Sequence, residues 1–170
     1  MTDLDSLTPY FDDNVINTDI DYSQIDLLYN IYLEDFSNNK LIINDKLIRI
    51  NKNLSNVNEF KKYHSTFHHI ITRNSHLLYT RVYDCHRANR IHWIKPILLN
   101  KNHKDILYYK WKDSDGVCKE HFYYLSKNFM VVLKTISEDF QIVTAFCVDD
   151  EDKFKFFERY RNYIDGIAVC

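Results

Sequence analysis

Apolar residues in the first half of the chain recur at steps of three and four, the spacing of one helix face. This pattern predicts a helix over residues 24–36, begun by Ser23 and Asp26, with apolar positions at Ile25, Leu28, Tyr29, Tyr32, Leu33 and Phe36. A second helical pattern spans residues 55–71. A third follows Asp84, a good N-cap, with Ala88, Ile91, Ile94 and Leu98 on one face and Pro96 expected to limit or kink the helix.

The second half of the chain alternates apolar and polar residues, as strands do. Four β-like runs, 105–112, 118–125, 129–136 and 140–148, are joined by short turn-forming segments, so we expect an antiparallel meander. Residues 41–50 predict two short strands around Asn44 and Asp45, residues 76–83 predict another strand, and residues 151–164 predict a closing helix. The predicted fold is α+β: N-terminal helices followed by a four-stranded antiparallel β-meander and a C-terminal helix, with the helices on one sheet face.

The length of 170 residues suits one domain with a real core. With only 2 glycines and 2 prolines, Asn and Asp must make most of the turns. Residues 1–20 lack periodicity. We therefore predict an acidic flexible arm over residues 1–22 and a single α+β domain over residues 23–170.

Charge is unevenly distributed along the chain. Residues 1–39 hold nine acidic residues and no Lys or Arg, whereas residues 40–170 hold 22 basic against 15 acidic residues. Such a basic body is able to attract a polyanion. An accidental segregation of charge is the alternative.

The cysteines and the absence of long apolar runs indicate where the protein resides. No apolar run approaches membrane-spanning length, and the N-terminus lacks the pattern of a secretory signal. Cys85, Cys118, Cys147 and Cys170 are widely spread. We expect reduced thiols in a cytoplasmic protein with no membrane partner.

Histidines and arginines between residues 64 and 90 are the candidates for catalysis. His68 or His69 is able to exchange a proton near neutral pH, and Arg81 and Arg90 are able to hold a phosphate. Thr144 adds a neutral hydroxyl donor. The candidate catalytic set is therefore His68, His69, Arg81, Arg90 and Thr144, although the arginines also suit a solvated helix face.

A second set of residues suits RNA binding, since aromatic rings stack on bases and cations contact the backbone. It comprises Arg73, Arg87, Tyr109, Lys110, Trp111 and Lys112. Core and edge packing is the alternative for the aromatic members.

Other chemistries have weaker support in the sequence. Zinc ligation by His64, His68 and His69, or by Cys118 and His121 with Cys85 and His86, lacks paired CxxC or HExxH spacing. A Cys85–His86 nucleophile is weak because sequence neighbours rarely face each other. There is no Gly-rich phosphate loop and no dinucleotide fingerprint, so we predict no metal and no cofactor.

Two segments carry a resemblance to a known superfamily. The block Arg87-Ala-Asn-Arg90-Ile-His-Trp93-Ile-Lys-Pro96 and the later Val143-Thr144-Ala145-Phe146 resemble phage-associated members of the barnase–EndoU–colicin E5/D–RelE-like nuclease superfamily, over residues 64–160. The resemblance implies a helical part before a four-stranded antiparallel sheet, and metal-independent ribonuclease toxins. Arg87, Arg90, Trp93 and Thr144 match directly, and the family histidine falls on His68 or His69.

We therefore expect a metal-independent, toxin-like ribonuclease that cleaves RNA by 2′-hydroxyl attack. Its expected partners are RNA and a cognate inhibitor protein. The alternative is a non-catalytic phage or bacterial protein that binds a partner protein or nucleic acid. A basic cleft shared by a histidine, Arg81 or Arg90, and Thr144 would favour the enzyme.

Overall fold

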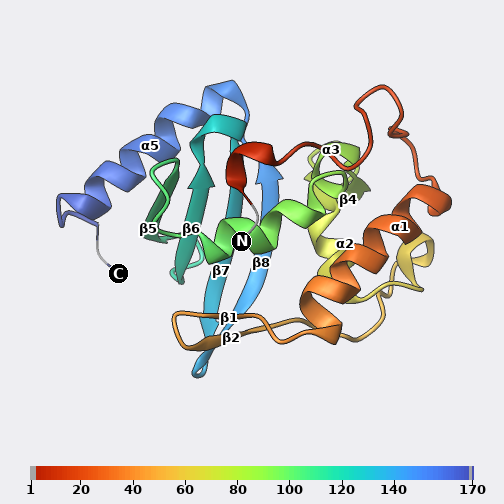
Figure 1. The fold of residues 1–170 in the computed structure, drawn as a ribbon, viewed down its shortest axis with the longest axis horizontal. Helices are drawn as coiled ribbons and strands as arrows, with labels where there is room; N and C mark the ends of the chain where they lie inside the picture. Colours follow the sequence, from red (N-terminus) through yellow and green to blue (C-terminus); the bar gives the residue numbers. More distant parts are fainter. Residues whose placement is uncertain (1–2, 169) are drawn as a thin grey trace.

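The computed structural model describes residues 3–168 and 170, and its centre is a mixed sheet of six strands in the order β1-β2-β8-β7-β6-β5 (Figure 1). The strands are β1 (Ile42–Ile43), β2 (Lys46–Arg49), β5 (Ile106–Lys112), β6 (Cys118–Tyr124), β7 (Phe129–Ile136) and β8 (Asp139–Cys147). All neighbours are antiparallel except β2 and β8, which run parallel. The helices are α1 (Tyr22–Tyr32), α2 (Ser65–Ile70), α3 (Cys85–Ala88), α4 (Ile94–Leu99) and α5 (Asp150–Ile164).

The general α+β class is confirmed, but a four-stranded antiparallel sheet is wrong. Strands β5 to β8 pair in sequence order as predicted, and the predicted β1–β2 hairpin then joins β8 through Ile48–Phe140 and Arg49–Gln141. Parallel neighbours need a long crossover, which no local turn signal encodes. The sheet is therefore larger and mixed.

Helices cover both faces of the sheet, not one as predicted. Along β7, Phe129, Val131 and Leu133 belong to the main core with α1, α2 and α4. Met130 and Val132 belong to a second core with Phe156 of α5. This alternation follows the two-residue period of a strand, and both sides of β7 are apolar because both are covered.

The first two predicted helices have different outcomes. The helix over residues 24–36 is confirmed as α1 and a π-helical turn (Leu33–Asn38). Its predicted cap, Ser23 with Asp26, is wrong, because Asp21 Oδ1 accepts from the Ser23 amide at 3.0 Å and caps the helix. The helix over residues 55–71 is only partly present, as a 3₁₀ turn (Asn58–Phe60) and α2. The Ser55 amide donates to the Tyr63 carbonyl, so this stretch folds back on itself before α2 begins.

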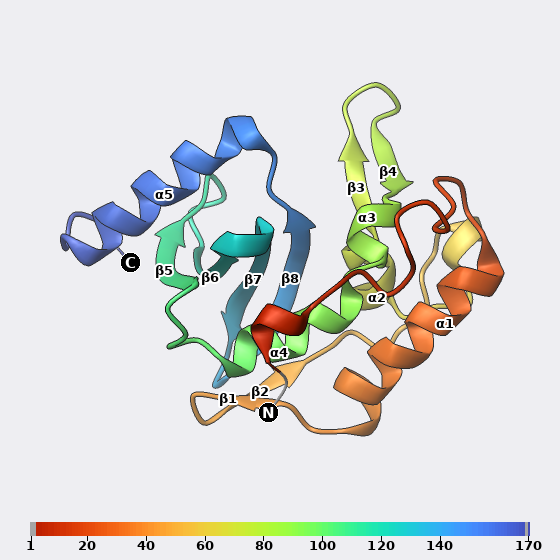
Figure 2. The same ribbon diagram turned by 45° about the horizontal axis from the view of Figure 1, so that its top comes forward.

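The predicted strand over residues 76–83 is shorter than expected. A separate hairpin of β3 (Thr72–Ser75) and β4 (Thr80–Tyr83) projects from the body (Figure 2). Residues 76–79 form its tip, with Leu77, Leu78 and Tyr79 exposed. Apolar residues at an exposed tip carry the same pattern as a strand, so the sequence could not separate the two.

The helix after Asp84 is confirmed at its cap and interrupted in its middle. Asp84 Oδ1 accepts from the Arg87 amide at 3.1 Å and starts α3, and α4 follows a 3₁₀ turn (Ile91–Trp93). The break falls at Asn89, whose buried side-chain amide bonds both backbone groups of Phe11. Pro96 lies in the first turn of α4, where its missing N–H is not needed.

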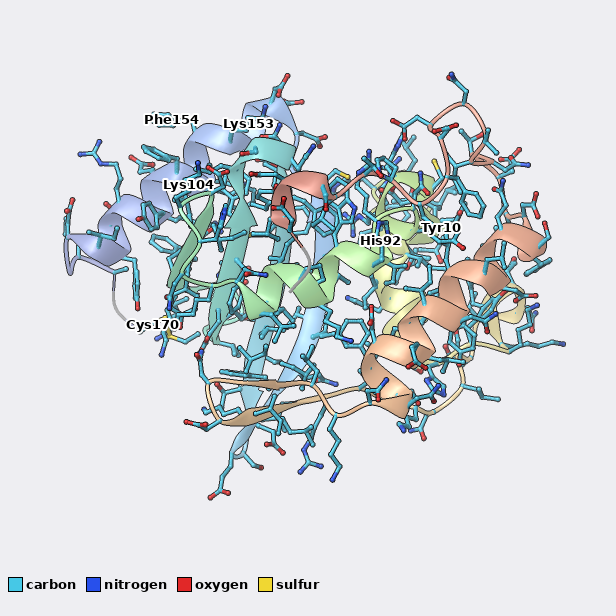
Figure 3. All side chains as sticks on the ribbon, in the orientation of Figure 1. Tyr10, His92, Lys104, Lys153, Phe154 and Cys170 are labelled. Carbon is cyan, nitrogen blue, oxygen red and sulfur yellow. A yellow bond between two sulfur atoms is a disulfide. The ribbon has the colours of Figure 1, made fainter. Side chains whose placement is uncertain are left out.

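The N-terminal segment is packed, in contrast to the flexible arm predicted for residues 1–22, of which residues 1 and 2 lie outside the described residues. Leu4, Leu7 and Ile16 are buried. The Trp93 indole donates to the Thr8 carbonyl at 2.9 Å, and Tyr10 lies beside His92 (Figure 3). The segment lacks apolar periodicity because it is held by hydrogen bonds to its backbone and does not pack through one face of a helix.

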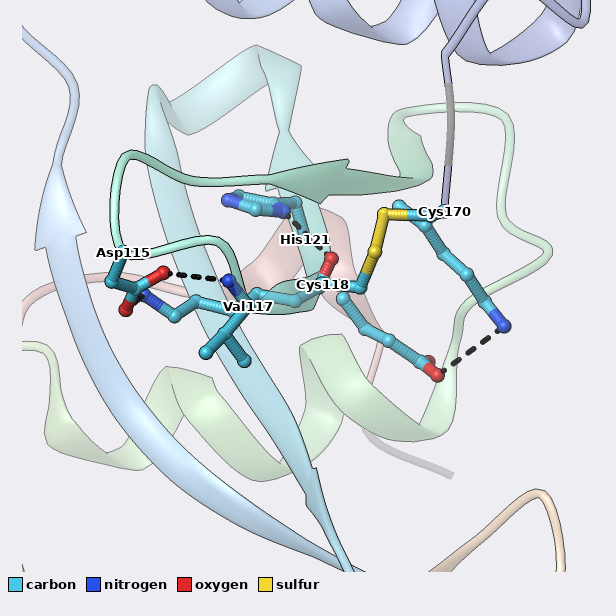
Figure 4. The surroundings of a disulfide bond; sticks show 8 residues. Asp115, Val117, Cys118, His121 and Cys170 are labelled. Atoms are coloured by element: carbon cyan, nitrogen blue, oxygen red, sulfur yellow. Dashed lines mark hydrogen bonds and ion pairs between the residues drawn. A yellow bond between two sulfur atoms is a disulfide. The ribbon is translucent and has the colours of Figure 1, made fainter.

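Two of the four cysteines form a disulfide, so the prediction of four reduced thiols is wrong. Cys118 at the start of β6 is bonded to Cys170, 52 residues later, where the chain end returns from α5 (Figure 4). Sequence spacing does not reveal this return. Cys85 and Cys147 are free. None of the helices formed by residues 3–168 is long and apolar enough to cross a bilayer.

Candidate functional site

The adjacent histidines of α2 have opposite environments. His68 is 8% exposed, its Nδ1 lies 3.0 Å from Ser55 Oγ, and its ring stacks on Phe60. Burial and then Arg81 lower the pKa of His68. His69 is exposed instead. His68 is therefore a packed core residue, and His69 is the histidine available to a substrate.

His69 opens into a pocket between α2 and β8. This pocket, here called the His69 pocket, has a volume of about 260 Å³ and is lined by Asn51, Ser65, Thr66, His69, Lys134, Gln141, Ile142 and Val143. Small-molecule sites usually hold about 300–1,000 Å³, so this one suits part of a polymer.

Local sheet geometry creates the pocket. β2 pairs with β8 only as far as Gln141, and α2 lies against the part of β8 that follows. Within β8, Val132 faces Thr144 and Leu133 faces Ile142, so Val143 is the extra residue of a β-bulge. Bulges bend a strand and redirect its side chains, and here the bulge lies at the pocket wall.

The His69 pocket is basic and its lining contains no carboxylate. Desolvation lowers the pKa of His69, and the positive charges of Arg81, Arg87 and Lys134 lower it further. Within the described part of the chain, no carboxylate lies within 4 Å of the Lys134 ammonium. The site thus offers a neutral imidazole at pH 7 beside an unpaired cation.

The guanidinium of Arg81, which the sequence predicted to hold a phosphate, is engaged by groups of the protein. Its Nε donates to Thr72 Oγ1 at 2.8 Å, and Nη1 donates to Asn74 Oδ1 at 3.0 Å. Its Nη2 donates to the carbonyls of His69 at 2.8 Å and Thr72 at 2.7 Å. Arg81 therefore joins the hairpin to the end of α2 and positions His69.

The three other arginines of the predicted site, Arg73, Arg87 and Arg90, also have partners within the chain. Arg87 donates to the Thr72 carbonyl at 3.1 Å and lies 3.4 Å from Asp84, which Arg73 approaches at 3.6 Å. Arg90 donates to the His86 carbonyl, lies over the Trp93 ring and is 3.7 Å from Asp13. Arg73 has the most exposed of these side chains, at 60%. These contacts differ from the free phosphate clamp that the sequence suggested.

The remaining predicted residues are not gathered at the pocket. Thr144 lies one residue beyond the lining residue Val143. Tyr109, Lys110, Trp111 and Lys112 form what we call the β5 edge, three strands from β8. Tyr109 is buried and stacked on His121, Lys110 is 3.8 Å from Glu120, and Arg159 lies over Trp111. Strands lie about 4.8 Å apart, so the β5 edge and the pocket are separate sites.

Sequence reasoning missed the pocket's polar partners. Lys134 is the one charged residue in the predicted strand 129–136, a signal that was available. Asn51, Ser65 and Gln141 had no such signal, because they meet only through the β2–β8 pairing and the α2–β8 contact.

Neither a search for metal ligands nor comparison with known proteins gives further information about this site. Among residues 3–168 and 170, no three His, Cys, Asp or Glu side chains are grouped so that they could hold a metal ion. Comparisons with protein-family models, curated proteins and solved structures find no match.

Proposed function

We propose that this protein is a metal-independent ribonuclease whose active site is the His69 pocket. The observation that carries the proposal is the exposed, neutral His69 in a pocket without carboxylates, beside Lys134. A lowered pKa keeps the imidazole unprotonated at pH 7, as a general base must be, and an unpaired cation attracts the phosphate.

The proposed reaction uses the 2′-hydroxyl of the substrate as nucleophile. His69 removes its proton, the 2′-oxygen attacks phosphorus, and the bond from phosphorus to the 5′-oxygen breaks. The leaving 5′-oxygen takes a proton, and the product ends in a 2′,3′-cyclic phosphate. The Lys134 ammonium opposes the charge that develops on the phosphoryl oxygens, and Asn51, Ser65 and Gln141 offer hydrogen bonds.

The proposed roles differ from those predicted from the sequence. Arg81 and Arg87 act on His69 through their charge, and Arg81 also through the His69 carbonyl, not by holding the phosphate. Lys134 takes the predicted role of the arginines.

A purified sample with a labelled RNA in EDTA tests the proposal. We expect cleavage that leaves 2′,3′-cyclic phosphate ends, and no cleavage of the matching DNA, which lacks the 2′-hydroxyl. A His69→Gln protein purified in parallel excludes a contaminating nuclease. Activity that EDTA abolishes and magnesium restores, or no activity at enzyme excess, would overturn the proposal.

A non-catalytic binding protein is the second candidate. It is favoured by the arginines, whose donors are engaged within the chain, and by the exposed tip formed by Leu77, Leu78 and Tyr79. RNA or DNA retained without cleavage would support it.

Cytoplasmic action and a cognate inhibitor protein remain part of the ribonuclease proposal. A reducing cytoplasm keeps thiols reduced, so the redox state of Cys118 and Cys170 in the cell tests this part of the proposal. Thiol labelling immediately after lysis should find both cysteines reduced if the protein acts there.

A further inference from the structure

The outward face of α5 carries an apolar stripe that the rest of the chain does not cover. Phe154 is 75% exposed, Phe157 45% and Ile164 59%. Together with Asp150 and Arg161 they recur at alternating steps of four and three, so they lie on one face of the helix. Figure 3 shows Phe154 on the outer side of α5, and the opposite face packs Phe156 into the second core.

A hollow adjoins the N-terminal half of this stripe. It holds about 310 Å³ and is lined by Tyr123, Leu125, Asn128, Lys153, Phe154 and Phe157. The stripe therefore combines projecting rings with a recess able to receive a ring, which is the form of a self-complementary surface.

Charge on the stripe changes sign from one end to the other. The first turn of α5 carries Asp150, Glu151 and Asp152, and its last turn carries Arg161. The Asp150 side chain pairs with Lys153 of the same helix but stays 93% exposed, and Arg161 is exposed with no carboxylate of the described residues within 4 Å. A parallel neighbour would set like charges together, whereas an antiparallel copy sets opposite charges together.

One two-fold axis satisfies both features of the stripe. If it passes midway between residues 155 and 156, Phe154 faces Phe157 of the second copy, and Asp150 faces Arg161 of the second copy. Both pairs share this midpoint, so one register makes two ring contacts and two ion pairs.

We propose that α5 is the interface of an antiparallel homodimer. Its 15 residues span about 22 Å, which is small against the roughly 800 Å² that each partner contributes to a standard interface, so the dimer is weak and reversible. The exposed face also carries Glu151, Glu158 and Asp165, which disfavours an anionic lipid or RNA in this place. The proposal does not depend on ribonuclease activity.

Sedimentation velocity of the oxidised full chain, followed from low to high micromolar concentration, tests the interface. We expect the mass to rise from 20.6 kDa toward twice that value. Phe154→Glu should hold the protein monomeric across the range. Leu77→Ser, which changes an even more exposed apolar side chain on the hairpin, is the matched control and should dimerise normally.

A charge exchange tests the register. Asp150→Arg or Arg161→Asp alone should weaken the dimer about tenfold, and the two together should restore it, which a loss of folding would not do. A wild-type monomer at all concentrations, a dimer that ignores Phe154→Glu, or binding only to phosphatidylglycerol vesicles would each overturn the proposal.

Discussion

The His69 pocket holds one residue that the sequence assigned to RNA cleavage, and the β5 edge holds four assigned to RNA binding, but their cations differ in pairing. At the β5 edge Lys110 lies near Glu120, and the adjacent Arg159 is 3.7 Å from Asp113, whereas Lys112 has no ion-pair partner among the described residues. In the His69 pocket Lys134 has no carboxylate within ion-pair distance among the described residues, and none lines the pocket. Cations that already have acidic partners contribute little to the binding of an anionic ligand. The pairing of the basic residues therefore matters more for RNA binding than their number.

The largest difference between the two regions should appear in catalysis. His69→Gln removes the proposed base, so we expect RNA cleavage in EDTA to slow by about 10²- to 10⁴-fold. Lys112→Gln at the β5 edge should stay within about twofold. Initial rates on one labelled RNA measure both, and equal losses would remove the distinction between the regions.

Reducing the disulfide should lower the stability of the fold around the β5 edge but leave cleavage at the His69 pocket unchanged. Cys118–Cys170 closes a loop with a sequence separation of 52, and its loss should lower the free energy of unfolding by about 4 kcal/mol. Thermal melts with and without a phosphine reductant should differ by roughly 10 °C. Cleavage at 25 °C should persist. A Cys118→Ser/Cys170→Ser protein is the control and should ignore the reductant.

Acid should destabilise the β5 edge through His121. This histidine is 3% exposed, and burial lowers its pKa to about 4. Because its folded pKa lies below its unfolded value, the unfolded chain binds more protons, and stability falls as pH drops from about 6.5 to 4. That loss is about 3 kcal/mol. Urea unfolding at pH 7 and pH 4 should show a smaller loss in His121→Phe, and an equal loss would contradict the assignment.

The smallest effect should come from Lys134→Gln. Removing this cation raises the pKa of His69 toward its ordinary value, because Lys134 is one of the charges that lower it. The acid limb of the cleavage rate, expected below pH 6.5, should move upward, and the plateau rate should fall about tenfold. A pH–rate profile measures both. An unmoved limb would mean that Lys134 does not act on His69.

Periodicity identified the elements but not their meeting points. The helix over residues 24–36 and the strands from residue 105 to residue 148 were predictable, since burial alone sets their spacing. The orientation of His68 and His69 was not predictable, because α2 is short and distant residues fix it: Ser55 bonds His68, and Arg81 bonds the His69 carbonyl. The same holds for the Cys118–Cys170 bond and the β2–β8 pairing, which join distant segments.

The packed N-terminal segment shows that the absence of periodicity also misleads. Its buried leucines follow no period, so the sequence predicted a loose arm. The contacts that hold it run to Asn89 and Trp93, neither of which the predicted helix face included. Polar side chains that bond a distant backbone leave no sign in a local pattern.

The parallel pairing of β2 with β8 also has a consequence during synthesis. Leu47 and Asp139, which bond across this pairing, are 92 residues apart. A ribosome adds about 5–20 residues per second, so the nascent β1–β2 hairpin waits about 5 to 20 seconds for its neighbour. During that interval β2 has an open edge, the kind of surface that recruits other chains. Chains that terminate before residue 139 would keep that edge permanently and should accumulate as aggregates.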